Sequence, residues 1–368
     1  MTLPDLSTRE LGMIRRPLAP HHLRAAAGLA PLWTLLAAPL LPLAAQVGDV
    51  RDVPDPAVIE ADGHYWVFST APGIEIRRSD DLWRWELVGT VFDAALPEWA
   101  QDAVPGTEFP WAPDISYFGD LYRLYYSLST FGGQRSVIAL ASNRTLDPSS
   151  PDYRWVDEGK VVESDPGEDP FNAIDPAIVV DEDGGPWMAW GSFWGGIKMR
   201  RIDPATGKVS SRDTTTYALA ARAGVDAVRG PRASQAVEGA YIVHRDGYYW
   251  LFVSFDACCR GAESTYNVRV GRSRSVSGPY VDRDGVPMTE GGGTLVMAGT
   301  GEIAGPGHNS VLHTHGRDYV VHHFVNVAEG PASPDAPLAI PRSLQVRPLY
   351  WAWDGWPVAG RPIEGPQG

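Results

Sequence analysis

Short apolar runs separated by turn-forming residues extend along most of the chain. From about Gly48 onward, runs rich in Val, Ile, Tyr, Trp and Phe alternate with clusters of Gly, Asp and Pro. Runs of this kind, bounded by such clusters, are typical of β-strands and hairpins. No long amphipathic helical pattern interrupts them. The sequence therefore predicts an all-β fold.

One pattern, a turn dipeptide followed by an aromatic run, recurs five times. Asp62–Ser69 and Asp246–Val253 are two copies, and each is typical of the second strand of a β-hairpin. Successive copies are 57 to 70 residues apart, which leaves room for about four strands and their loops, the content of one propeller blade. Five copies predict a five-bladed β-propeller. The aromatic residues that anchor the copies are Tyr65, Tyr122, Trp187, Tyr249 and Tyr319.

A polar residue among small or apolar neighbours precedes each aromatic run. The innermost strand of a propeller blade lines the central channel, so one equivalent residue per blade would converge on the axis. Carboxylates buried together shift one another's pKa values apart, which suits acid–base chemistry and not a core. The alternative is that these residues merely start strands at the solvent, where no common register is needed. The five residues are Asp55, Asp114, Asp175, Glu238 and His308.

Composition and charge limit the kinds of molecule that the protein is expected to bind. Hydrophobic residues make up 44% of the 368, which excludes wholesale disorder. The formal charge is −14 and the chain has no basic tract. Nucleic acids and anionic membranes both require clustered Lys and Arg, so neither is expected as a partner. A neutral polymer is compatible with this charge.

The N-terminal region has the features of a secretory signal peptide. Basic residues precede an apolar stretch from Ala25 to Ala45 that ends in small residues, and prolines interrupt it. A retained membrane anchor is the alternative, but the prolines disfavour a spanning helix. We expect residues 1–46 to be a signal peptide and N-terminal extension and residues 47–368 to be the catalytic domain. The protein is then secreted, either to the periplasm or to the exterior.

The only two cysteines, Cys258 and Cys259, are adjacent. Neither their number nor their spacing indicates a zinc site. They are either two reduced, buried thiols or a vicinal disulfide, which requires a strained eight-membered ring.

Five ordered motifs carry a family resemblance. They are Phe109–Ile115, Phe171–Pro176, Trp190–Ile197, Phe255–Gly261 and Gly305–Ser310. In this order they resemble the arabinanases of glycoside hydrolase family 43, and the likeness covers Gly48 to about Pro362. It implies an inverting hydrolase that cleaves α-1,5-linked arabinofuranose chains of arabinan internally, and we expect a monomer.

The resemblance also implies roles for individual residues. Asp55 would be the general base that activates water, Glu238 the general acid, and Asp175 the carboxylate that raises the pKa of Glu238 and orients it. Inverting glycosidases need two carboxyl groups roughly 6.5–9.5 Å apart, which residues from different blades can provide. His308 would hold calcium on the axis. Calcium prefers about six to eight oxygen ligands, so most of them would be water.

The sugar-contacting residues are likewise implied by the resemblance. Trp111 and Trp194 either stack on furanose rings or fill the blades. Pro54 stands where many arabinanases have His, which leaves the choice of substrate open. The alternatives are an exo-acting arabinofuranosidase or β-xylosidase of the same family, and a propeller that binds carbohydrate without cutting it. The implied substrate-binding residues are Asp114, Trp111, Asn172, Gly191, Ser192 and Phe193.

Overall fold

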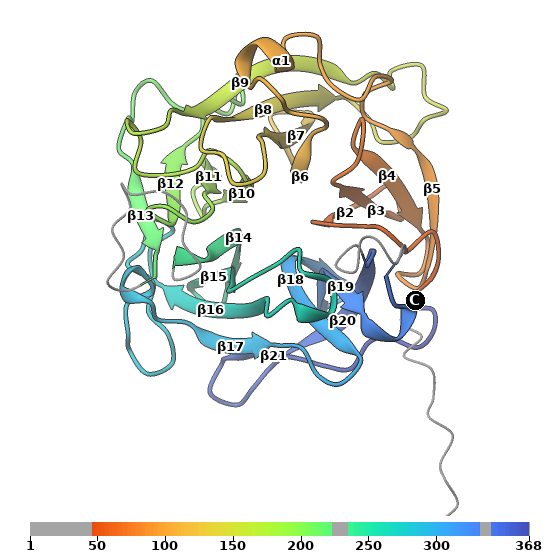
Figure 1. Ribbon diagram of the computed structural model, residues 1–368, viewed down its shortest axis with the longest axis vertical. Coiled ribbons are helices and arrows are strands. Elements are labelled where there is room, and N and C mark those ends of the chain that lie inside the picture. Colours follow the sequence, from red (N-terminus) through yellow and green to blue (C-terminus); the bar gives the residue numbers. More distant parts are fainter. Residues whose placement is uncertain (1–45, 223–234, 332–339, 368) are drawn as a thin grey trace, which may run out of the picture. The chain divides into compact units, whose positions relative to one another are not determined.

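Five β-sheets stand around a common axis (Figure 1). The computed structural model describes residues 46–222, 235–331 and 340–367. They belong to the unit Leu43–Gly368, and the predicted signal peptide lies outside them apart from its last position, Gln46. The five-bladed β-propeller predicted from the repeats is confirmed.

Each blade is an antiparallel sheet of four strands in sequence order from the axis outward, and blade 1 has an extra parallel strand at its outer edge. Blade 1 contains β2 (Ala57–Ala61), β3 (His64–Ser69), β4 (Glu75–Ser79), β5 (Arg84–Thr90) and the extra β1 (Val47–Gly48); blade 2 contains β6 (Trp111–Phe118), β7 (Leu121–Leu128), β8 (Ser136–Asn143) and β9 (Val156–Ser164). Blade 3 contains β10 (Ala177–Val180), β11 (Pro186–Trp190), β12 (Ile197–Arg201) and β13 (Tyr217–Ala220); blade 4 contains β14 (Val237–Arg245), β15 (Tyr248–Phe255), β16 (Asn267–Ser273) and β17 (Thr294–Met297). Blade 5 contains β18 (Ile303–Thr314), β19 (Arg317–Asn326), β20 (Arg342–Trp351) and β21 (Pro357–Ala359).

The predicted hairpins join the first two strands of the blades. In blade 1, Ala61 pairs with His64 across Asp62 and Gly63, whose φ angles are 53° and 76°. Positive φ at both central residues is the type I′ pattern that matches the twist of the strands. All five aromatic anchors lie in second strands, β3, β7, β11, β15 and β19, as the repeats predicted.

The core consists of side chains packed between neighbouring blades. The second and third strands are covered on both faces, so β8 is buried along its whole length. Between blades 5 and 1, Tyr65 and Val67 pack against Leu312 and Val321, all at most 6% exposed. The aromatic residues of the repeats therefore serve the packing between sheets.

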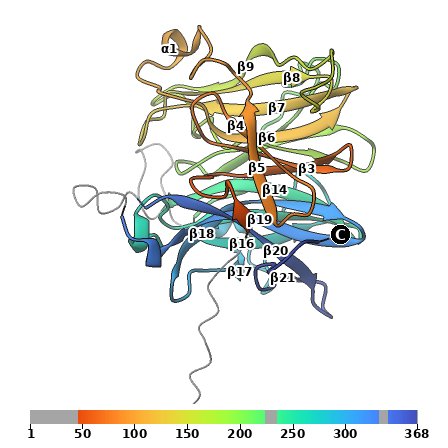
Figure 2. The same ribbon diagram turned by 90° about the vertical axis from the view of Figure 1, so that its right-hand side faces the viewer.

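Helices are short in the described part of the chain. The helix α1 (Ala100–Ala103) lies on the outside of blade 2 near β9 (Figure 2), where the indole of neighbouring Trp99 donates to Asp157. One-turn 3₁₀ helices occupy Gly261–Glu263, Met288–Glu290 and Val327–Glu329. None of these helices has the length and hydrophobicity to cross a bilayer.

The ring closes between blades 5 and 1 without a shared sheet. The backbone N–H of Val53 donates to the carbonyl of Arg342 (2.7 Å), and that of Leu344 donates to the carbonyl of Val50 (2.8 Å). The buried side chain of Gln46 accepts from the N–H of Val346 (2.9 Å) and donates to its carbonyl (3.4 Å). Residues 46–53 thus bind the last blade to the first.

Candidate active site

Every blade has a residue in the left-handed backbone region on its inner side, at or just before the start of the inner strand in blades 1 to 4 and in the middle of β18 in blade 5. Only one of the five is a glycine, and other residue types adopt this conformation rarely, so the surroundings must stabilise it. The residues are Asp55 (φ 54°), Ala112 (41°), Asp175 (58°), Gly239 (58°) and His308 (48°).

Hydrogen bonds from the preceding blade hold these residues in place. In four blades the backbone N–H of the left-handed residue donates to a side chain at the end of the preceding blade's second strand. In blade 4 the N–H of Gly239 donates instead to Asp175 Oδ2 (3.2 Å). The other four bonds are Asp55 N to His323 Nδ1 (3.0 Å), Ala112 N to Thr70 Oγ1 (2.7 Å), Asp175 N to Ser127 Oγ (3.0 Å) and His308 N to Ser254 Oγ (2.9 Å).

This pattern corrects the expectation of one equivalent polar residue per blade. Asp55, Asp175 and His308 do occupy equivalent positions. In blade 2 that position belongs to Ala112, and Asp114 lies two residues further along β6. In blade 4 Glu238 comes one residue before the equivalent Gly239. β-Bulges shift the register of β6 and β14 at these points, and a bulge changes the count of residues along a strand.

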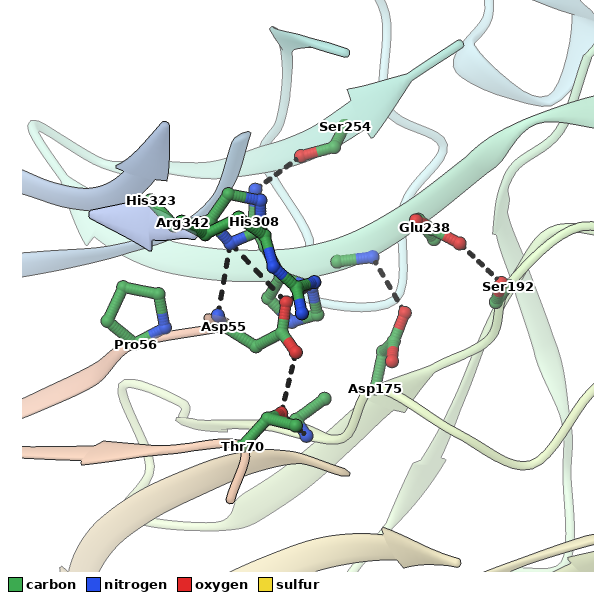
Figure 3. Close-up of polar contacts among 12 residues, drawn as sticks. Asp55, Pro56, Thr70, Asp175, Ser192, Glu238, Ser254, His308, His323 and Arg342 are labelled. Atoms are coloured by element: carbon green, nitrogen blue, oxygen red, sulfur yellow. Dashed lines mark hydrogen bonds and ion pairs between the residues drawn. The ribbon is translucent and has the colours of Figure 1, made fainter. Parts of the chain in front are cut away.

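The carboxylate of Asp55 is surrounded by donors (Figure 3). Thr70 Oγ1 donates to Oδ2 (2.6 Å), and Oδ1 lies 3.2 Å from His308 Nδ1. Burial opposes the charge, but His308 and Arg342 outweigh it and hold the pKa of Asp55 well below its usual range. Asp55 is therefore ionised throughout the neutral range.

His323 is uncharged and holds the backbone of Asp55 in position. Its Nδ1 accepts the N–H of Asp55, so the ring proton is on Nε2. Burial lowers the pKa of His323 to about 4. The ring of Tyr266 stacks on it with centroids 5.9 Å apart, which fixes its orientation. We infer that the 3.4 Å approach of His323 Nδ1 to Asp55 Oδ1 is not an ion pair, because the imidazole is uncharged.

Asp175 and Glu238 form a coupled acidic pair. Ser192 Oγ donates to Glu238 Oε2 (2.6 Å), and the N–H of Gly239 donates to Asp175 Oδ2 (3.2 Å). Burial, then repulsion from Glu238 and Asp55, raises the pKa of Asp175 well above its ordinary value. Because two neighbouring buried carboxyls resist carrying two charges, the ionised form of Asp175 is disfavoured. Figure 3 shows Asp55, Asp175 and Glu238 turned toward one space.

Four of the residues implied as sugar contacts lie in two segments, Asn172 three residues before Asp175 and Gly191–Phe193 directly after β11. Asn172 donates weakly to the carbonyl of Gly133 (3.4 Å), and its buried Oδ1 has no hydrogen-bond partner among the described residues. Gly191 has φ of 129°, and a Cβ there would lie 2.5 Å from the carbonyl oxygen of Gly196, so only glycine fits. Ser192 orients Glu238. The N–H of Phe193 donates to the carbonyl of Val237 (3.1 Å), which ties blade 3 to blade 4.

The tryptophans and Asp114 differ in accessibility. Trp194 is 6% exposed, whereas Trp111 is partly exposed at the start of β6. Asp114 is 4% exposed and accepts the N–H of Ile178 (2.9 Å). Burial raises the pKa of Asp114 to about 8. Asp114 is therefore buried within β6, two residues beyond the left-handed Ala112.

Sequence reasoning missed several residues of the site. His323 and Arg342 contact or attract Asp55 from blade 5, and Thr70 does so from blade 1. The His322-His323 pair in the fifth aromatic run was a signal, since histidine is unusual in a buried strand. Phe131 is a further residue that was missed. It is 85% exposed on the loop that follows β7, and the carbonyl of Gly133 in the same loop accepts a hydrogen bond from Asn172.

The cysteines are free thiols, but the expectation that both are buried is wrong, because neither is fully buried. Cys258 is half-buried, whereas Cys259 is exposed. Cys259 adopts φ of 61°, which turns the chain outward at this residue.

The donors around His308 are few. Among the residues that the structure describes, no group of three or more His, Cys, Asp and Glu side chains is placed to hold a metal ion. His308 offers one imidazole and Asp55 one nearby carboxylate. This set fits a calcium ion only if water supplies most of its ligands.

A family model described as Glycosyl hydrolases family 43 matches residues 50–357. The chain belongs to this family. The family resemblance inferred from the five motifs is thereby confirmed.

Similar proteins share most of the chain's length. It is 39% identical over 310 residues to an extracellular exo-α-(1→5)-L-arabinofuranosidase of Cellvibrio japonicus, covering 83% of this chain and 86% of that one. It is 35% identical over 307 residues to an extracellular endo-α-(1→5)-L-arabinanase of Bacillus subtilis, with coverage of 82% and 86%. The solved structure of a Cellvibrio cellulosa α-L-arabinanase with arabinohexaose superposes with a TM-score of 0.78 at 37% identity, covering 84% of this chain and 96% of that one.

Proposed function

We propose that this family 43 glycoside hydrolase cleaves internal α-1,5-L-arabinofuranosidic bonds of arabinan with inversion. The observation that carries the proposal is the convergence of Asp55, Asp175 and Glu238, each with different hydrogen-bond partners. Asp55 is held ionised, whereas the pKa of Asp175 is raised by burial and by its neighbours Glu238 and Asp55. An inverting hydrolase requires this division between base and acid.

The proposed mechanism assigns one task to each group. Glu238, oriented by Ser192, donates the proton to the leaving glycosidic oxygen. Asp175 lies near Glu238, so a second negative charge in the pair is unfavourable. Asp55, oriented by Thr70 and the backbone contact to His323, accepts the proton of a water that attacks the anomeric carbon from the opposite face.

The substrate class is supported by the relatives and by the charge. The solved relative binds arabinohexaose, and the curated relatives bear arabinan-cleaving names. A formal charge of −14 is compatible with a neutral polysaccharide and unfavourable for a polyanion. All three carboxylates are in place, which disfavours a propeller that only binds sugar.

Exo action is the second candidate. It is favoured by the 39% identity to the exo-acting Cellvibrio japonicus enzyme, against 35% to the Bacillus subtilis endo enzyme. An exo enzyme needs a pocket closed at one end, whereas an endo enzyme needs a groove open at both ends. The products distinguish the two.

The deciding experiment is the size profile of products from linear debranched arabinan, followed from the first minutes. Mixed oligosaccharides support endo action, and a single short product from the start supports exo action. The Glu238→Ala variant should release none of these products, with circular dichroism confirming that it folds. Proton NMR of the first product reports the anomer, and retention of configuration would contradict the assignment of Asp55 as base.

We also propose that the protein is secreted, as its extracellular relatives are. Expression with residues 1–46 in a bacterial host should release a shorter protein outside the cytoplasm. N-terminal sequencing should place its start near Gln46. An intact N-terminus on membrane-associated protein would instead support an anchor.

We propose that His308 contributes to a largely hydrated calcium site on the axis. Calcium, when bound, would supply positive charge near the carboxylates. Isothermal titration with calcium should show one site in the wild type that is weakened in His308→Ala. Equal affinity in both proteins would place any calcium elsewhere.

A further inference from the structure

The adjacent cysteines lie in a well-anchored loop that the mechanism does not use. This loop joins β15 to β16 in blade 4. The N–H of Thr265 donates to the carbonyl of Ala257 (3.0 Å), and the N–H of Ala257 returns a bond to Thr265 Oγ1 (3.2 Å). The loop therefore holds the two thiols side by side at the surface, with Cys259 exposed and Cys258 half-buried.

One side chain connects this dithiol to the proposed base. Arg342 Nη1 lies 3.7 Å from Cys259 Sγ. The same guanidinium attracts Asp55, and its charge contributes to the lowered pKa of that carboxyl. A chemical change at Cys259 therefore reaches the active site through one partly buried arginine.

The two thiols differ in reactivity. A hydrogen bond from Cys258 lowers the pKa of Cys259, with Arg342 assisting and burial opposing. The same hydrogen bond raises the pKa of Cys258. An exposed thiol with a lowered pKa attacks disulfides readily, and a neighbouring thiol can then resolve the mixed disulfide.

We propose that Cys258 and Cys259 form a reversible modification site whose substrate is a low-molecular-weight disulfide. The Cys259 thiolate attacks the reagent, its S–S bond breaks, and one thiol leaves. Cys258 then loses its proton, attacks the Cys259 sulfur and displaces the second thiol. Two protein thiols are oxidised by two electrons, and the reagent disulfide is reduced to two thiols.

The geometry makes the product reducible. Adjacent Cα atoms are about 3.8 Å apart across a trans peptide, below the roughly 4.4–6.8 Å of ordinary disulfides. Closing the ring must therefore distort the loop, and strained disulfides are reduced easily. Oxidation also removes the thiolate that faces Arg342. The modified loop then no longer holds the guanidinium in its present position.

The first test measures the modification itself, so it does not depend on the proposed function. The full chain is incubated with oxidised glutathione and analysed by intact and peptide mass spectrometry. The peptide with both cysteines should lose two hydrogens and regain them with dithiothreitol. Cys258→Ser should stop at one glutathione adduct, and Cys259→Ser should react much more slowly. A stable adduct on the wild type, or thiols that react only after denaturation, would overturn the proposal.

The second test measures the consequence for catalysis, and it rests on the proposed function. Oxidation should lower kcat on arabino-oligosaccharides about fivefold with KM unchanged, and dithiothreitol should restore it. The Cys258→Ser/Cys259→Ser double variant should keep its kcat through the same treatment. If the disulfide forms and kcat does not change, the link through Arg342 is wrong. If the enzyme cleaves no arabinan at all, the mass data still test the modification site.

Discussion

At the scale of single residues, Thr70 links the proposed base to the next blade. Its hydroxyl donates to Asp55 Oδ2 (2.6 Å) and accepts the N–H of Ala112 (2.7 Å). Thr70→Val removes both bonds and should lower kcat/KM about 10- to 100-fold, since a hydrogen bond to a charged group contributes about 1.5–3 kcal/mol. Thr70→Ser keeps the hydroxyl and should remain near wild type. Equal activity of the two variants would contradict an orienting role.

Asp114 gives a prediction about pH. Its folded pKa of about 8 lies above the ordinary 3.8, so the folded state binds more protons between these values. The free energy of unfolding should therefore fall as pH rises from about 4 to 8. Asp114→Asn cannot ionise and should be more stable than wild type at pH 9, by at most roughly 5–6 kcal/mol, and similar at pH 4.

Thermal unfolding of the wild type and Asp114→Asn across this pH range checks the prediction. The Tm of the wild type should fall on the alkaline side more steeply than that of the variant. Parallel curves for the two proteins would mean that Asp114 ionises without cost in the fold.

At the scale of elements, the loop between β7 and β8 carries an exposed aromatic side chain two residues from the Gly133 that bonds to Asn172. Phe131 is 85% exposed, and Gly133 in the same loop contacts Asn172. Phe131→Ala should raise KM for long arabino-oligosaccharides about three- to tenfold with kcat unchanged, because a stacked aromatic contact contributes about 0.5–1.5 kcal/mol. Tyr350→Ala, at a 60% exposed aromatic on blade 5, is the control and should leave KM unchanged.

Some of these elements could be predicted from the sequence and others could not. The hairpins were predictable because Asp-Gly turns and aromatic strands are local signals, and Asp62-Gly63 behaves as expected. The bulges in β6 and β14 were not predictable from the sequence. The position of an inserted residue depends on packing against the next strand, and it has no fixed residue type. Asp114 was therefore assigned to the ring that Ala112 occupies. Arg342 was missed because nearly 290 residues separate it from Asp55.

At the scale of the whole molecule, the propeller depends on contacts that close the ring. Blades 5 and 1 share no sheet, so the segment 46–53 and the interblade core must hold them together. A site built from blades 1, 3, 4 and 5 is formed only when the ring is closed. Stability and the alignment of the carboxylates are therefore coupled through this closure.

The side chain of Gln46 tests that coupling. It is 6% exposed and bonds to both backbone groups of Val346. Gln46→Ala leaves the buried N–H of Val346 without the Gln46 partner, while its carbonyl still accepts the N–H of Ile363 (3.1 Å), so the free energy of unfolding should fall by about 1–3 kcal/mol in urea denaturation. Gln101→Ala also removes two hydrogen bonds, but both lie within six residues of Gln101, and this control should lose less. If the two variants lost equal stability, the contacts of residues 46–53 would contribute no more than a local turn does. The packing of side chains between blades 5 and 1 would then have to hold the ring closed by itself.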